Sequence, residues 1–228
     1  MQQLQSQLAQ VKSQILHACH TNQRNPDTVQ LLAVSKTHPA DSIKALFELG
    51  QDAFGENYLQ EALGKIEHLK SLAIQWHFIG HVQRNKTKSL AENFAWVHGV
   101  DRLLIAERLS SQRPDNLAPL NICIQVNIDG QETKDGCPPD AVPDLVSQIS
   151  KLERIRLRGL MVIPAPENTA AFAKTQKLFE QVKSQHANPQ DWDTLSMGMS
   201  GDLKEAIAGG STMVRIGTAL FGARDYNQ

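Results

Sequence analysis

The segment Leu31-Leu32-Ala33-Val34-Ser35-Lys36-Thr37-His38-Pro39 guides the interpretation of the whole chain. Four consecutive apolar residues bounded by polar ones are typical of a strand that is buried on both faces. Lys36 follows where such a strand ends, and ligands bind at the carboxyl ends of inner strands in α/β proteins. A desolvated lysine loses proton affinity, and its neutral amine can condense with an aldehyde. A surface lysine that opens a loop is the alternative interpretation of this segment.

Seven further strand candidates alternate with helix candidates along the chain. They are expected at residues 52–55, 75–79, 95–98, 120–127, 157–163, 194–197 and 212–216. This alternation implies parallel strands with right-handed crossovers, and eight parallel strands close into a barrel. An open doubly wound sheet is the alternative, but a Gly-rich phosphate-binding turn normally follows its first strand. The predicted fold is therefore α/β, a single (β/α)8 TIM-type barrel.

An extra helix is predicted before the first strand. Its apolar stripe consists of Leu4, Leu8, Val11 and Ile15, at spacings of four, three and four residues. We expect this N-terminal helix, over residues 1–20, to pack on the barrel within one domain spanning residues 1–228. Asp41 or Ser42 is predicted to cap the helix after Lys36, and one long helix is predicted over residues 169–185.

The composition argues against several classes of function. The 228 residues carry a formal net charge of −1, so no footprint for nucleic acid or anionic membrane is visible. No apolar run approaches the roughly 18 residues of a membrane span, and the first residues show no export signal. Three cysteines at unrelated spacings favour a reducing cytoplasm over a disulfide framework. His17, Cys19 and His20 lack a second ligand pair, so we expect no metal site.

The last two loops of the predicted barrel favour a phosphate group. The seventh loop leads into a helix where Asp202 and Glu205 have the spacing of a capping box. A free helix N-terminus offers N–H groups and a partial positive charge, and Gly217-Thr218 follows the eighth strand. Barrels commonly bind phosphate at these two loops. Tight turns alone are the alternative explanation for the glycines.

Arg215 shares the strand parity of Met213 and Gly217. If this parity faces the barrel, the buried guanidinium needs an acceptor, and the ring nitrogen of a cofactor would serve. The alternative is an outward Arg215 that pairs with a carboxylate on a neighbouring helix. A lysine for an imine, a phosphate cradle and a cation for a ring nitrogen together suggest pyridoxal 5′-phosphate (PLP).

Six ordered motifs between Leu31 and Tyr226 closely resemble one known family. They are Ala33-Val34-Ser35-Lys36, Phe54-Gly55-Glu56-Asn57-Tyr58, Trp76-His77-Phe78-Ile79-Gly80, Gly159-Leu160-Met161, Ser196-Met197-Gly198-Met199-Ser200 with Asp202, and Val214-Arg215-Ile216-Gly217-Thr218. The chain resembles the pyridoxal phosphate homeostasis proteins, also called the proline synthase co-transcribed or YggS-type family. The resemblance implies a barrel like the N-terminal domain of bacterial alanine racemase.

The resemblance also implies a set of cofactor contacts. The cofactor would be held as an internal aldimine on Lys36, with its pyridine nitrogen against Arg215. The other implied contacts are Ser200, Gly217 and Thr218 for the phosphate, and Asn57, His77 and Met199 for the ring pocket.

The resemblance implies a carrier or buffer of PLP that supports vitamin B6, amino-acid and keto-acid homeostasis and serves apo-enzymes as recipients. An alanine-type amino-acid racemase is the alternative, and regulation by docking on a partner protein is a third. Racemisation needs an acid/base group opposite Lys36, which alanine racemase takes from a tyrosine of a second subunit. Here the tyrosines are Tyr58, expected to pack at a helix start, and Tyr226, and we expect no second domain after the eighth strand. We therefore expect a monomeric, cytoplasmic, non-catalytic carrier.

Overall fold

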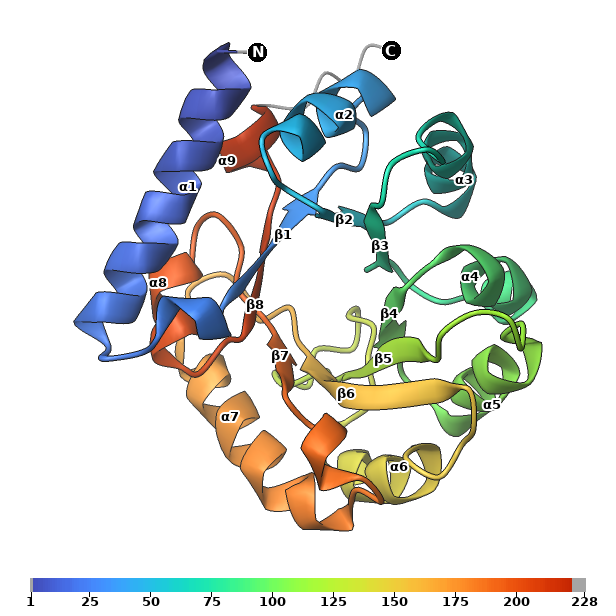
Figure 1. The fold of residues 1–228 in the computed structure, drawn as a ribbon. Coiled ribbons are helices and arrows are strands. Elements are labelled where there is room, and N and C mark those ends of the chain that lie inside the picture. Colours follow the sequence, from blue (N-terminus) through green and yellow to red (C-terminus); the bar gives the residue numbers. More distant parts are fainter. Residues whose placement is uncertain (1, 223–228) are drawn as a thin grey trace.

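The computed structural model describes residues 2–222 and contains eight parallel strands closed into one barrel (Figure 1). Consecutive strands are hydrogen-bonded neighbours, and β1 also pairs with β8, which closes the sheet. The strands are β1 (Gln30–Val34), β2 (Ala53–Glu56), β3 (Gln75–Phe78), β4 (Trp96–Val100), β5 (Leu120–Gln125), β6 (Ile155–Met161), β7 (Thr194–Ser196) and β8 (Met213–Ile216). The predicted barrel is confirmed, and the open doubly wound sheet is excluded.

Helices surround the barrel and connect its strands (Figure 1). They are α1 (Gln2–Thr21), α2 (Ala40–Glu48), α3 (Leu59–His68), α4 (Thr87–Asn93), α5 (Leu103–Gln112), α6 (Val142–Ile149), α7 (Ala170–Val182), α8 (Leu203–Ala208) and α9 (Thr218–Phe221). Short 3-10 turns lie at Pro26–Thr28, Arg84–Lys86, Pro139–Ala141, Lys183–Gln185 and Pro189–Asp191. The long helix predicted over residues 169–185 is therefore α7 followed by a 3-10 turn.

The predicted cap of α2 is wrong. The N-cap residue is Pro39, and no side chain makes a capping hydrogen bond. Pro39 has an extended backbone, with φ −69° and ψ 156°, so the chain enters the helix before it reaches Asp41 or Ser42.

Side chains along each strand point alternately to opposite sides, and most of those on both sides are buried. The barrel interior contains its own apolar cluster, formed by Leu32, Val34, Ala53, Ile79, Trp96, Cys123, Met161 and Met213. The larger core lies between the strands and the helices, and includes Ala33, Phe54 and Ile122. The apolar run 31–34 is thus explained by burial on both sides of β1.

The N-terminal helix α1 packs on the outside of the barrel against α8 and α9 (Figure 1). Its buried side chains are Leu8, Val11, Ile15, Ala18 and Cys19. Beyond its end, Arg24 Nη1 donates to the carbonyl oxygens of Ile207 at 2.8 Å and Ser211 at 2.7 Å. The extra helix is therefore confirmed, and the segment after it is tied to α8 and to the loop between α8 and β8.

Among residues 2–222, no helix combines the length and the apolar character that crossing a membrane requires. In the same range, no group of three His, Cys, Asp or Glu side chains is arranged to hold a metal ion. The cysteines Cys19, Cys123 and Cys137 are all buried and free.

The main chains at the carboxyl ends of β2, β3 and β4 approach one another at glycines. A Cβ atom on Gly80 would lie 2.4 Å from the carbonyl oxygen of Asn57, and one on Gly99 would lie 2.4 Å from that of Gly80. Both distances are far shorter than van der Waals contact, so a larger residue would push the main chains apart. Gly80 therefore sets where Asn57 lies.

We predict that Gly80→Ala lowers the free energy of unfolding by about 1–3 kcal/mol, because the added methyl group overlaps the main chain at Asn57. Gly64→Ala is the matched control, since Gly64 is exposed in α3 with open space around it. Alanine at this helical position should stabilise the chain by about 0.5–1 kcal/mol. Urea denaturation measures both effects, and wild-type stability of Gly80→Ala would contradict the close approach.

Candidate functional site

The carboxyl ends of the strands surround a cavity of about 240 Å³. It is lined by seven of the eight predicted site residues, namely Lys36, Asn57, Met199, Ser200, Arg215, Gly217 and Thr218. Its other lining residues, which the sequence analysis missed, are Val34, Ile79, Ile163 and Gly201. Strand alternation could have identified the inward-facing Val34 and Ile79. Ile163 and Gly201 lie in loops, where no such periodicity exists.

The cavity carries positive charge. Among the described residues that line it, Lys36 and Arg215 carry charge and none is a carboxylate. Its volume is below the roughly 300–1,000 Å³ of clefts that hold drug-sized ligands. The cavity therefore suits a small anionic ligand.

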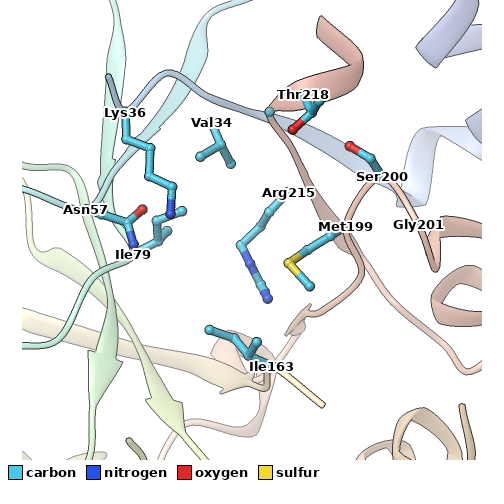
Figure 2. A pocket seen from close by; sticks show the side chains of 11 residues that line it. Val34, Lys36, Asn57, Ile79, Ile163, Met199, Ser200, Gly201, Arg215 and Thr218 are labelled. Carbon is cyan, nitrogen blue, oxygen red and sulfur yellow. The ribbon is translucent and has the colours of Figure 1, made fainter. Parts of the chain in front are cut away.

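Lys36 and Asn57 lie on one side of this cavity, beyond the ends of the neighbouring strands β1 and β2 (Figure 2). Asn57 Oδ1 is buried and accepts no hydrogen bond from the residues that the structure describes. Leaving a buried polar group unpaired costs about 1–3 kcal/mol. A donor on a bound ligand would offset this cost, so Asn57 is suited to hold a ligand beside Lys36.

Ser200 and Thr218 lie on the other side of the cavity (Figure 2). The backbone N–H groups of Ser200, Gly201, Thr218 and Ala219 donate to no acceptor within residues 2–222. Gly217 passes close to β1, because a Cβ atom there would lie 3.3 Å from the carbonyl oxygen of Val34. Free backbone N–H groups next to hydroxyls are the donors that a phosphate requires.

Asp202 stabilises the β7–α8 loop in a way that the sequence did not predict. Its Oδ1 accepts a hydrogen bond from the backbone N–H of Met199 at 2.6 Å, and its side chain makes no capping bond to α8. The predicted capping box with Glu205 is therefore wrong, because the carboxylate closes the turn at residues 199–202 instead.

Arg215 is 4% exposed, and its guanidinium points toward the cavity (Figure 2). Nη1 donates to the carbonyl oxygen and hydroxyl of Ser196, the latter at 2.9 Å, and Nη2 donates to the carbonyl oxygen of Val162 at 2.9 Å. Burial lowers the pKa of Arg215 to about 10, and Asp202 opposes this shift, so the group is a cation at neutral pH. The inward orientation is thus observed, and the alternative of an outward Arg215 is wrong.

His77 lies beneath the cavity and does not line it. Its ring is fully buried in the barrel and stacks on Trp96, with 5.2 Å between the ring centroids. Ile79, two residues further along the chain, is the residue that reaches the cavity. The family resemblance implied His77 for the ring pocket, but the residue lies one layer deeper, because residues of the same parity form successive layers in a barrel.

A chain of hydrogen bonds links His77 to Arg215. His77 Nδ1 lies 2.9 Å from His98 Nε2, and His98 Nδ1 lies 2.9 Å from the Ser196 hydroxyl, which accepts from Arg215. Because a guanidinium only donates, most groups are satisfied when Ser196 donates to His98 and His98 donates to His77. Of the four nitrogens of these two rings, only His77 Nε2 then has no partner among the described residues. Burial lowers the pKa of His77 to about 3 and that of His98 well below its usual value, so both rings are neutral.

Comparison with known proteins identifies relatives that have the same fold. The chain matches the model of the family described as "Alanine racemase, N-terminal domain" over residues 9–225. An alanine racemase of Clostridium difficile 630 shares 14% identity and a TM-score of 0.68, covering 95% of this chain and 57% of that one, which shows the fold alone. The molecule is thus a barrel of the alanine racemase N-terminal class.

Two relatives are considerably more similar. A pyridoxal phosphate homeostasis protein of Pseudomonas aeruginosa is 51% identical over 231 residues, covering 99% of this chain and 98% of that protein. PipY of Synechococcus elongatus has been solved both without PLP and with PLP bound, and each match covers 96% of this chain and 100% of PipY. The structure without PLP shares 36% identity with a TM-score of 0.86, and the structure with PLP shares 37% identity with a TM-score of 0.77. The chain belongs to the pyridoxal phosphate homeostasis protein family.

We predict that His77 makes the protein less stable in acid. The pKa of His77 is about 3 in the folded protein and about 6.5 in the unfolded chain. Between about pH 3 and pH 6.5 the imidazole is therefore protonated in the unfolded chain and neutral in the folded protein. Stability should fall as the pH drops below about 6.5, by up to about 1.4 kcal/mol per pH unit from this group. His77→Asn keeps an acceptor in place of Nδ1 and should reduce this slope.

Urea denaturation at several values between about pH 7 and pH 4 tests the prediction. His68→Asn is the control, because His68 is exposed on α3 and its variant should retain the wild-type slope. The same slope in His77→Asn and wild type would contradict a neutral, buried His77.

Proposed function

We propose that this chain binds PLP and carries or buffers it, supporting vitamin B6, amino-acid and keto-acid homeostasis without a dedicated catalytic activity. The observation that carries the proposal is a single cavity lined by a lysine, a buried arginine and two hydroxyls, with free backbone N–H groups at its rim. Relatives support it, since one is named a pyridoxal phosphate homeostasis protein and PipY has been solved with PLP bound.

The residues present fit the phosphate and the ring of this cofactor. Ser200, Gly217 and Thr218 would surround the phosphate dianion, whose charge the cationic cavity favours. Arg215 would donate to the pyridine nitrogen from below. His77 would act on the ring only through Arg215, because it does not line the cavity.

Lys36 supplies the primary amine of the cavity, and Asn57 and Met199 would flank the ring. When bound, the cofactor supplies an aldehyde, which condenses with a primary amine. The unpaired Oδ1 of Asn57 would accept a polar hydrogen of the ligand. These contacts would hold the reacting carbon on the side of the cavity where Lys36 lies.

A carrier fits this cavity better than a racemase, which needs a second acid/base group facing Lys36. The described residues that line the cavity include no histidine, carboxylate, cysteine or tyrosine. Tyr58 is 56% exposed and does not line the cavity, so the expectation that it packs is wrong. Tyr226 lies outside the described residues. A guanidinium at the pyridine nitrogen would keep that nitrogen unprotonated and weaken the ring as an electron sink, which disfavours transamination and decarboxylation but is compatible with racemisation.

We further propose that residues 1–228 act as one monomeric domain in the cytoplasm and hand PLP to apo-enzymes. Three free, buried cysteines fit a reducing compartment. Met199 and Ile163, which line the cavity, are 40% and 39% exposed. An open mouth of this kind would leave the bound cofactor accessible to an acceptor protein.

We predict that PLP forms an imine with Lys36 and with no other residue of the cavity. Wild type incubated with PLP and then treated with borohydride should lose its yellow absorbance and gain the mass of one reduced adduct. Lys36→Ala should gain none at this site, whereas Lys44→Ala, which removes an exposed lysine of α2, should behave as wild type. Peptide mapping of the reduced protein locates the adduct, and an unmodified Lys36 would contradict the proposal.

An alanine exchange assay on the same samples separates the carrier from the racemase. Exchange between D- and L-alanine should not exceed that of free PLP. Saturable exchange that Lys36→Ala abolishes would establish the racemase instead.

We predict that Ser200→Ala and Thr218→Val weaken binding of phosphorylated ligands selectively. A hydrogen bond to a charged group contributes about 1.5–3 kcal/mol, so each variant should raise the Kd for pyridoxine 5′-phosphate about 10-fold or more. The Kd for pyridoxine should not change, because this ligand lacks the phosphate. Calorimetry measures both constants, with Ser13→Ala, on the exposed face of α1, as the control. Equal losses for the two ligands would contradict a phosphate contact at these hydroxyls.

A further inference from the structure

A buried lysine outside the cavity has no role in the site described above. Lys65 belongs to α3 and is 7% exposed. Its Nζ donates to the carbonyl oxygen of Ser35 at 2.8 Å, to Glu56 Oε1 at 2.7 Å and to Glu61 Oε1 at 2.5 Å. Lysine is almost never buried without such partners, so these three oxygens explain how Lys65 is accommodated. They do not explain what it does.

The contacts of Lys65 and Glu61 fall on the two peptide groups that flank Lys36. Lys65 donates to the carbonyl oxygen of Ser35, which belongs to the peptide group before Lys36. Glu61 Oε1 accepts the backbone N–H of Thr37 at 2.6 Å, and this N–H belongs to the peptide group after Lys36. The two side chains are one turn apart on α3 and are paired with each other. A single turn of α3 thus holds the main chain on both sides of Lys36.

The backbone conformation of Thr37 is one that surrounding contacts must stabilise. Its φ is +66°, a left-handed conformation that is uncommon for residues other than glycine and unfavourable for a β-branched one. Such a conformation persists only when surrounding contacts enforce it. The hydrogen bond from Thr37 to Glu61 is a contact of this kind.

Glu56 completes the network on the helix-facing side of the barrel wall. Its Oε1 accepts from both Lys65 Nζ and the Ser35 hydroxyl, at 2.7 Å and 2.6 Å. Burial raises the pKa of Glu56, and Lys65 opposes that shift. A buried ion pair is often no more stabilising than apolar residues of the same volume. A positional role accounts for the network better than stability does.

We propose that Lys65 and Glu61 are positioning residues for Lys36. They fix its main chain so that the amine is presented to the aldehyde carbon of bound PLP. The Lys36 nitrogen forms a double bond to that carbon, and the aldehyde oxygen leaves as water with the two amine hydrogens. The inference rests on the proposed function and adds two residues of α3 that do not touch the cofactor.

The test separates covalent attachment from binding. Rapid mixing with PLP follows imine absorbance, and calorimetry with pyridoxine 5′-phosphate, which has no aldehyde, reports on the pocket alone. Lys65→Met should slow attachment by about 10- to 100-fold, because small misplacements of a reacting group have effects of this size. The Kd for pyridoxine 5′-phosphate should stay at the wild-type value.

Glu61 supplies a graded pair of variants. Glu61→Gln keeps an oxygen that can accept the Thr37 N–H and should attach PLP at nearly the wild-type rate, whereas Glu61→Leu should be slow. The Glu61 side chain is 29% exposed, so its substitution should disturb folding less than that of Lys65. The two Glu61 variants therefore test the inference even if Lys65→Met does not fold. Lys88→Met is the matched control, since it removes a lysine from an exposed pair with Glu92, also one turn apart, on α4.

Three outcomes would overturn the inference, and they differ from one another. Wild-type attachment rates in both Lys65→Met and Glu61→Leu would refute positioning and leave the Lys36 imine intact. A parallel loss of pyridoxine 5′-phosphate binding would make the network a general support of the pocket. Failure of wild type to attach PLP at all would refute the proposed function, and the inference with it.

Discussion

The pairing of β1 with β8 is the interaction on which the rest of the molecule depends. Residues 30–33 pair with residues 213–216, which joins the first and last strands and closes the sheet. Closure leaves no strand edge exposed and creates an interior that is separate from the outer core. It also brings Lys36, just beyond β1, to the same cavity as Thr218, just beyond β8. The candidate site is therefore a direct consequence of barrel closure.

A cation inside an apolar barrel is the main electrostatic feature of that site. The cost of burying Arg215 is offset by hydrogen bonds to Ser196 and Val162. Electrostatic interactions are stronger in such surroundings than in water, so the same charge favours an anionic ligand above it. Below it, His98 and His77 are buried and neutral, so neither ring adds a positive charge next to Arg215.

Consecutive residues at the end of β1 face opposite sides of the barrel sheet, so they contact two different environments. Ser35 faces outward to Glu56 and Lys65, and Lys36 faces inward to the cavity. β2 does the same, with Glu56 outside and Asn57 inside. The charged network of α3 can thus hold the main chain of Lys36 while remaining apart from any ligand. This separation allows a lysine to be fixed in place without a carboxylate entering the cationic cavity.

The sequence by itself determined the eight strands, the barrel, the extra helix and seven residues of the cavity lining. The strands, the barrel and the helix depend on local patterns: buried runs mark strands, and a stripe at helical spacing marks α1. The cavity residues were identified mainly through the resemblance to a known family, and strand parity alone left the direction of Arg215 open. Local patterns do not show how deep a side chain lies in the barrel, or which side chains of different elements contact each other. The position of His77 below the cavity follows from the layers of the closed barrel, and the bond from Met199 to Asp202 follows from the course of a loop. The contact of Lys65 with the segment around Lys36 joins positions 30 residues apart, so only the tertiary structure could decide it.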